Sequence, residues 1–179
     1  MFAKRFLCGF AFVLSGFLLS SFQLPKKLEK KVTKEIHKVF EISDYNLRAV
    51  VVPSDINKTL PISIRPDNFY AVVQNDSLQG YLFIEKAPSK TAQFDYMILF
   101  DADLIVKKTK VLVYREEYGG EIASSRWLKQ FVGKTTKSSL VYKRDIAAIS
   151  GATISVRSMT NAVNKVLKTV GILHNNKLI

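Results

Sequence analysis

The stretch "FYAVVQNDSLQGYLFIEKA", residues 69–87, decides the fold of this 179-residue chain. Two runs rich in β-branched and aromatic residues, 69–74 and 77–87, flank the dipeptide Asn75-Asp76. Runs of this kind around a short Asn- and Asp-containing turn are typical of a β-hairpin, because these residues tolerate the backbone conformations of a tight turn. The stretch therefore predicts two antiparallel strands.

Further strand-like runs on both sides extend the predicted hairpin. "NLRAVVVP" (46–53) precedes it, and "FDYMILFD" (94–101) and "LIVKKTKVLVYRE" (104–116) follow it. Short loops between these runs predict an antiparallel meander. The alternation of apolar and polar residues indicates a sheet with one buried face.

Helical spacing replaces the strand pattern after the meander. "YGGEIASSRWLKQFVGK" (118–134) has apolar residues on one side of a short helix that we expect to stop at Gly133. A last helix is predicted over 155–170, with Gly171 as its C-terminal stop. A sheet with helices packed on it predicts an α+β domain over residues 46–179.

The N-terminal stretch, residues 1–24, has the features of a signal-anchor. Its positions 6–24 form an uncharged run of 19 residues. A membrane-spanning helix needs about 20 apolar residues. Ser20-Ser21 is a poor cleavage site, so an uncleaved transmembrane helix is favoured over a cleaved signal peptide.

Residues 25–45 are predicted to form an amphipathic, basic stalk helix. Leu28, Val32 and Ile36 recur at helical spacing, with lysines between them. The basic face suits anionic headgroups, and a merely solvated face explains it equally well. The lysine count after the apolar run would place the body of the protein in the cytoplasm by the positive-inside rule, whereas the signal-like pattern favours export.

The overall composition is strongly basic, with 27 Lys and Arg against 15 Asp and Glu and a net charge of +12. Such a charge suits nucleic acid, an anionic membrane surface or an anionic ligand. No nucleic-acid motif accompanies it, so nucleic acid is not the expected partner. The alternative function is a basic non-redox binding module of the same fold, for nucleic acid or a protein partner. One cysteine excludes an intramolecular disulfide, and the two histidines lack metal-site spacing, so no metal is predicted.

A loop of small residues, Ser150-Gly151-Ala152-Thr153, stands at the predicted start of the last helix. The first turn of a helix offers free N–H groups and partial positive charge, which suit a phosphate. Gly151 and Ala152 let an anion approach the backbone, and Thr153 adds a hydroxyl that can be esterified. The other interpretation is structural: Ser150, Thr153 or Ser155 caps the helix. The residues alone leave both open, because P-loop and nucleophile-elbow spacings are missing.

Three motifs in order resemble the FMN-binding domain family, which occurs in peripheral subunits of the Rnf complex and of the sodium-pumping NADH:quinone reductase. "SGATIS" (150–155) resembles the family's flavinylation motif. "YREEYGGE" (114–121) resembles its glutamate-and-glycine loop, and "WLKQFVGK" (127–134) its W-x-x-Q-F-x-G-K helix. Glu116-Glu117-Tyr118-Gly119 replaces the frequent Glu-Thr-Pro-Gly, and Ala147 stands where an aspartate is common.

The resemblance implies FMN joined covalently through its phosphate to Thr153. It implies a membrane-anchored, extracytoplasmic electron carrier or subunit of a redox complex rather than a stand-alone enzyme, and so no catalytic residues. A flavin transferase and redox proteins are the implied partners. For Tyr118, Trp127 and Phe131, contact with the flavin ring and burial in the core are equally weighted. The residues assigned to cofactor binding besides Thr153 are Ser150, Gly151, Ala152, Ser155, Glu116, Tyr118, Gly119, Gly120 and Trp127.

Overall fold

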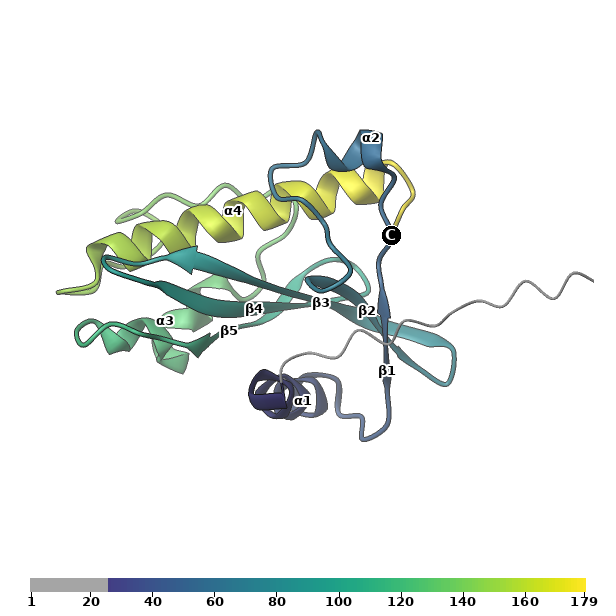
Figure 1. The fold of residues 1–179 in the computed structure, drawn as a ribbon, viewed down its shortest axis with the longest axis horizontal. Helices are drawn as coiled ribbons and strands as arrows, with labels where there is room; N and C mark the ends of the chain where they lie inside the picture. The colour runs from purple at the N-terminus through teal and green to yellow at the C-terminus, as the bar shows by residue number, and fades with distance from the viewer. Residues whose placement is uncertain (1–25) are drawn as a thin grey trace, which may run out of the picture.

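A computed structural model describes residues 26–179 of the chain. The signal-anchor predicted for residues 1–24 lies outside these described residues. Within them, no helix combines the length and the apolar character needed to cross a membrane. The described part is a sheet with helices on both faces (Figure 1).

The sheet confirms the predicted antiparallel meander, with its five strands in the order β1-β2-β3-β4-β5. The turn between the second and third strands has positive φ angles of 48° at Asn75 and 58° at Asp76, as a tight hairpin needs. The strands are β1 (Asn46–Ala49), β2 (Phe69–Gln74), β3 (Ser77–Pro88), β4 (Gln93–Asp101) and β5 (Val106–Val113).

The first strand is shorter than predicted, because β1 ends at Ala49 instead of continuing to residue 53. The chain then leaves the sheet edge and forms a short helix that the sequence did not predict, α2 (Ser54–Asn57). The amide of Ile62, which follows α2, donates to Thr169 in the last helix at 3.2 Å. This connection therefore fastens the edge of the sheet to the helix layer above it.

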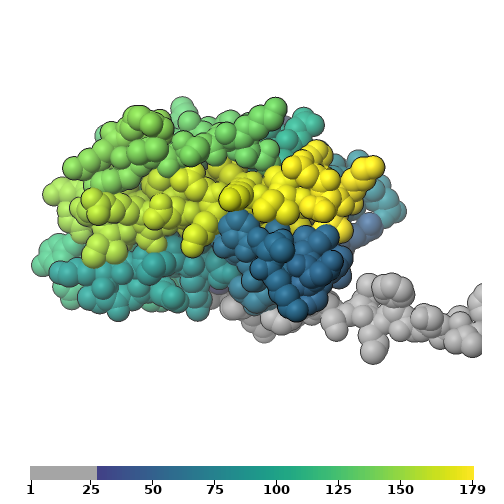
Figure 2. All heavy atoms as spheres, turned by 90° about the horizontal axis from the view of Figure 1, so that it is seen from above, coloured from purple at the N-terminus to yellow at the C-terminus, as the bar shows by residue number. Residues whose placement is uncertain are grey.

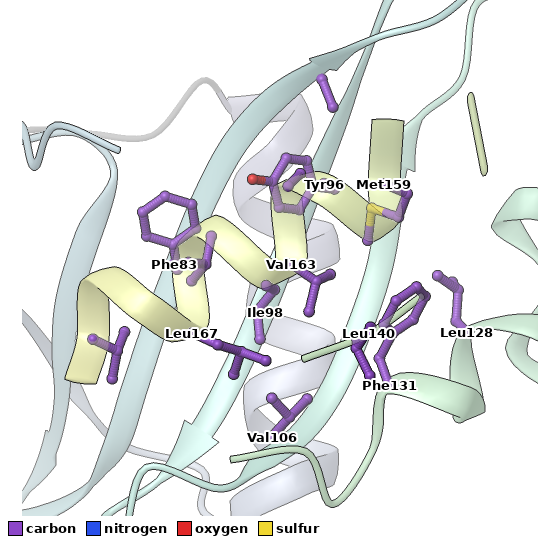
Figure 3. Packing of buried hydrophobic residues seen from close by; sticks show 14 of the residues in the cluster. Phe83, Tyr96, Ile98, Val106, Leu128, Phe131, Leu140, Met159, Val163 and Leu167 are labelled. Carbon is purple, nitrogen blue, oxygen red and sulfur yellow. The ribbon is translucent and has the colours of Figure 1, made fainter. Parts of the chain in front are cut away.

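The long C-terminal helix α4 (Thr153–Asn175) covers one face of the sheet (Figures 1 and 3). Val163 and Leu167 of this helix are fully buried with Phe83 and Ile98 of the sheet. In the view from above, α4 lies between the green segment that precedes it in sequence and the blue segment around α2 (Figure 2). These layers enclose the main core of the domain.

The prediction that Gly171 stops the last helix is wrong, because α4 continues to Asn175. A Cβ atom at Gly171 would lie 3.2 Å from the Cβ of Thr136, which is tighter than ordinary contact. The small residue is therefore explained by the close approach of the segment before α4. It does not need a helix terminus.

The opposite face of the sheet is covered by α1 (Lys26–Phe40), so the prediction of a single buried face is also wrong. Val32 and Ile36 of α1 pack on a second cluster that includes Leu82, Met97 and Leu112. Covering both faces explains why every residue from 94 to 100 in β4 is buried. The helix predicted as a stalk packs directly on the sheet in the structure.

The segment 118–134, predicted to contain one short helix that stops at Gly133, instead forms three short helical turns. They are η1 (Gly120–Ala123), α3 (Ser125–Leu128) and η2 (Lys129–Phe131). Ser124 interrupts the run with an extended backbone, and its side chain caps α3 by accepting a hydrogen bond from the Trp127 amide at 3.2 Å. The predicted stop at Gly133 is consistent with its positive φ of 78°.

Candidate flavin site

The loop that leads into α4 is held by two residues of the short turns, Trp127 and Gln130. The indole Nε1 of Trp127 donates to the carbonyl of Ala147 at 2.8 Å. The Gln130 side chain accepts from the Ala147 amide at 2.8 Å and donates to the Trp127 carbonyl at 2.8 Å. Trp and Gln of the "WLKQ" segment therefore fix the backbone three residues before Ser150.

Trp127 and Phe131 belong to the core, which decides one alternative that the sequence left open. Phe131 is fully buried, and its ring lies 5.3 Å from that of Trp127 in an edge-on arrangement. Tyr118, by contrast, exposes 76% of its surface. Among these three aromatic residues, Tyr118 is the one that offers an open ring face to a ligand.

Within residues 26–179, no side chain caps the start of α4. The N-cap residue is Ala152, and the first backbone hydrogen bond of the helix runs from the Val156 amide to the Ala152 carbonyl at 2.9 Å. Ser155 is buried and pairs with the Tyr114 hydroxyl at 3.1 Å, while Thr153 is exposed. The capping interpretation of the three hydroxyl residues is therefore wrong. The helix start keeps its free N–H groups and its partial positive charge.

Two glycines bring the loop after β5 against the loop before α4. Gly119 has a φ of +76°, and a Cβ atom there would lie 2.4 Å from the Cβ of Ala152. Gly151 has a φ of +75°, and a Cβ atom built there would lie 3.8 Å from the Cβ of Tyr118. No atom lies within 4 Å of a Cβ built on Gly120. Of the neighbouring glycines 119 and 120, Gly119 is therefore the sterically constrained one.

A cavity of about 360 Å³ lies where these two loops meet the helix start. Six of the predicted site residues line it, and they come from separate parts of the sequence. Ile154, half exposed, and Tyr118 provide apolar surface beside the polar helix start. The predicted residues that line the cavity are Glu116, Tyr118, Gly151, Ala152, Thr153 and Ser155.

Ser150 and Trp127 lie on the other side of the loop. They line a neighbouring cavity of about 460 Å³ together with Gln130 and Arg126. Gly119 lines neither cavity and acts through its contact with Ala152. Gly120 lines neither of the two and makes no such contact. The predicted site residues are therefore divided between two cavities, which the loop 147–152 separates.

Three residues that line the Thr153 cavity were not among the predicted site residues: Lys90, Tyr114 and Ile154. Lys90 belongs to the turn between β3 and β4, far from the motif in sequence, and no local pattern indicates that it lies there. The Tyr114 hydroxyl donates to the Tyr118 carbonyl at 3.2 Å and pairs with Ser155. Its place at the start of "YREEYGGE" was the signal available for it.

Glu116 fixes the turn that carries Lys90. Its carboxylate accepts from the Thr91 amide at 2.7 Å, the Thr91 hydroxyl at 2.8 Å and the Ala92 amide at 3.1 Å. The nearby Ser89 hydroxyl, followed by these donors, lowers the pKa of Glu116 to about 2. The Ser89 hydroxyl lies outside hydrogen-bond geometry, so the bonds that hold the turn come from Thr91 and Ala92. Glu116 is therefore an ionised positioning residue at the cavity edge.

The comparisons with known proteins concern the family and the fold. Residues 91–168 match the model of the FMN-binding domain. The fold is similar to the crystal structure of Shewanella oneidensis NqrC, with a TM-score of 0.57 and 14% sequence identity over 86% of this chain and 98% of that one. No curated protein matches the sequence. The resemblance to the FMN-binding domain family is thus confirmed by the match over residues 91–168.

Proposed function

We propose that this protein is an electron-transfer flavoprotein that carries FMN on Thr153. The proposed bond is a phosphoester between the Thr153 hydroxyl oxygen and the FMN phosphate. One observation carries the proposal: Thr153 is the exposed first residue of α4 and opens onto the cavity, although no side chain caps the helix there.

The residues around Thr153 suit a phosphate and a flat ring. Free amides at the helix start and the ammonium group of Lys90 supply the positive charge that a phosphate diester needs. Gly151 has no side chain to keep the phosphate away from the backbone. Tyr118 and Ile154 provide exposed apolar surface on which an aromatic ring packs. Bound flavin supplies the redox chemistry, while the chain holds and orients it.

Attachment needs a partner enzyme, and we propose a flavin transferase for this role. The donor in this step is a flavin dinucleotide: the Thr153 oxygen bonds to its flavin-side phosphorus, the pyrophosphate P–O bond breaks, and the nucleoside monophosphate leaves. The Thr153 proton is released with it, so the protein gains the mass of FMN less one water. Exposure of Thr153 gives the transferase access to the hydroxyl. We also propose that residues 1–24 anchor the chain to the membrane, with the domain outside the cytoplasm. A covalent bond keeps FMN in place there, and redox proteins would exchange electrons with it.

Intact mass after coexpression with a flavin transferase tests the proposal. Thr153→Ala should abolish the FMN adduct, whereas Ser150→Ala, which removes another exposed hydroxyl of the same loop, should retain it. Since Thr153 does not cap α4, its loss should change the free energy of unfolding by no more than about 0.5 kcal/mol. An adduct that persists in Thr153→Ala would refute the assignment.

The alternative function, a basic non-redox binding module, makes an opposite prediction. Its protein would stay colourless after coexpression with the transferase and would bind DNA or a protein partner in a salt-dependent manner. The proposed flavoprotein should be yellow and should keep its colour after denaturation.

A further inference from the structure

We propose that the outer face of α1 docks on anionic lipid headgroups. The inference rests on the proposed membrane attachment of the N-terminal segment and adds a second, electrostatic contact to it. The docking face consists of Lys30, Lys34 and Lys38, with Lys108 and Lys110 of β5 beside them.

The helix α1 has two distinct sides. Val32 and Ile36 are buried against the sheet. Lys30, Lys34 and Lys38 are exposed, and their spacing of four residues places them on one face. The helix is therefore held on the sheet by its apolar side and presents a row of ammonium groups outward.

Lysines of β5 add to this positive surface. Lys108 Nζ lies 3.6 Å from the Glu35 carboxylate, and Lys110 forms an ion pair and hydrogen bond with the same group. Burial alone would raise the pKa of Glu35, but these lysines outweigh it and lower the pKa, so the carboxylate is ionised. Glu35 belongs to α1 and is itself buried. One buried negative charge thus orients two lysines and leaves the outer face positive.

The position of α1 in the chain favours a lipid surface as the occupant. The uncharged run of residues 6–24 is separated from Lys26 by Pro25 alone. If that run inserts in a membrane, α1 begins at the level of the headgroups. Basic residues next to an anionic surface are attracted to it, and salt screens this attraction. Charge complementarity and the short connection therefore point to the same partner.

Docking through α1 leaves the candidate flavin site open. The helices α1 and α4 lie on opposite faces of the sheet (Figure 1). The Thr153 cavity is at the start of α4, and so on the side away from α1. A protein seated on α1 would present this cavity to the aqueous phase, where a flavin transferase or redox protein has access.

Lysine acetylation of the full chain, reconstituted in vesicles and read by mass spectrometry, tests the docking. Vesicles of phosphatidylcholine are compared with vesicles that also contain phosphatidylglycerol. Lys30, Lys34 and Lys38 should be acetylated about fivefold more slowly in the anionic vesicles, and high salt should remove the difference. The exposed residues Lys137, in the segment beside α4, and Lys168, in α4, serve as internal controls with equal rates in both.

A single charge reversal provides the matched variant. Lys34→Glu should remove most of the lipid-dependent protection of Lys30 and Lys38, whereas Lys137→Glu should leave it unchanged. If the chain floated with both vesicle types and its lysines were acetylated equally in both, the docking of α1 would be refuted. The proposed membrane anchor would not be contradicted by that result. Flotation on anionic vesicles alone, with protection, would support docking and contradict the anchor. A chain that floats on neither would overturn both.

Discussion

Gly119→Ala should disturb the stability of the fold and the candidate flavin site together. Gly119 has a φ of +76°, which costs an alanine about 1–2 kcal/mol. The new Cβ would also lie 2.4 Å from the Cβ and 3.1 Å from the Cα of Ala152. Neither atom can move by a rotamer change, so one loop must shift, at about 1–3 kcal/mol. The expected loss is about 2–5 kcal/mol in the free energy of unfolding.

Thermal unfolding of the full chain in detergent, followed by circular dichroism, measures this loss. A change of 1 kcal/mol shifts Tm by about 2–4 °C in a protein of this size, so Tm should fall by about 4–20 °C. The yield of FMN adduct after coexpression with a flavin transferase is the second measurement. It should also fall, because a shift of Ala152 moves its neighbour Thr153.

The matched control is Gly120→Ala. This position has no positive φ, and no atom lies within 4 Å of a Cβ built there, so both measurements should equal those of the wild type. If Gly119→Ala unfolded within 1 °C of the wild type and carried as much FMN, the close approach of the two loops would be refuted.

Three further predictions concern hydrogen bonds and charges. Trp127→Phe keeps a buried ring but removes the donor to the carbonyl of the exposed residue Ala147, so chemical denaturation should show a loss of about 0.5–1.5 kcal/mol. Glu116→Gln should flatten the pH dependence of stability between pH 4.5 and 2. Folding lowers the pKa of Glu116 from 4.5 to about 2, so the stability that the carboxylate contributes is complete above pH 4.5 and is lost as the pH falls through 2. Acid titration of the wild type and the variant measures this difference. Glu35→Ala should cost about 1–3 kcal/mol in the same denaturation assay, because Lys108 and Lys110 lose their buried partner while remaining partly exposed.

The sheet was predictable because its determinants are local. Strand-forming runs and the turn at Asn75-Asp76 specify which segments pair, and β2 through β5 follow one another without a crossover. The burial of both faces was not predicted, although "FDYMILFD" in β4 contained the signal. A run of residues buried on both sides has no alternation, whereas the flanking strands suggested one buried face.

The candidate site was predictable only where the sequence itself is contiguous. "SGATIS" indicates the helix start and Thr153 directly. Lys90 lies at the same cavity because it belongs to the β3–β4 turn, and Glu116 holds that turn by hydrogen bonds. The positions of both residues depend on how the strands pair, which cannot be read from a local sequence pattern. Trp127 was assigned to the cofactor because aromatic residues serve both cores and ligands. Its indole bond to Ala147 is a long-range contact that only the structure shows.

Packing and chemistry are both needed to explain the small residues before α4. Ala152 is small because Gly119 passes directly over it, and Gly151 adopts a φ of +75° that few other residues accept. Packing therefore accounts for these two positions without any ligand. It does not account for Thr153, which is exposed, follows the N-cap and caps nothing. Thr153 lines a cavity together with Lys90 and stands at the start of a helix. Because packing and capping do not explain this threonine, attachment of a ligand to its hydroxyl is the explanation that we favour.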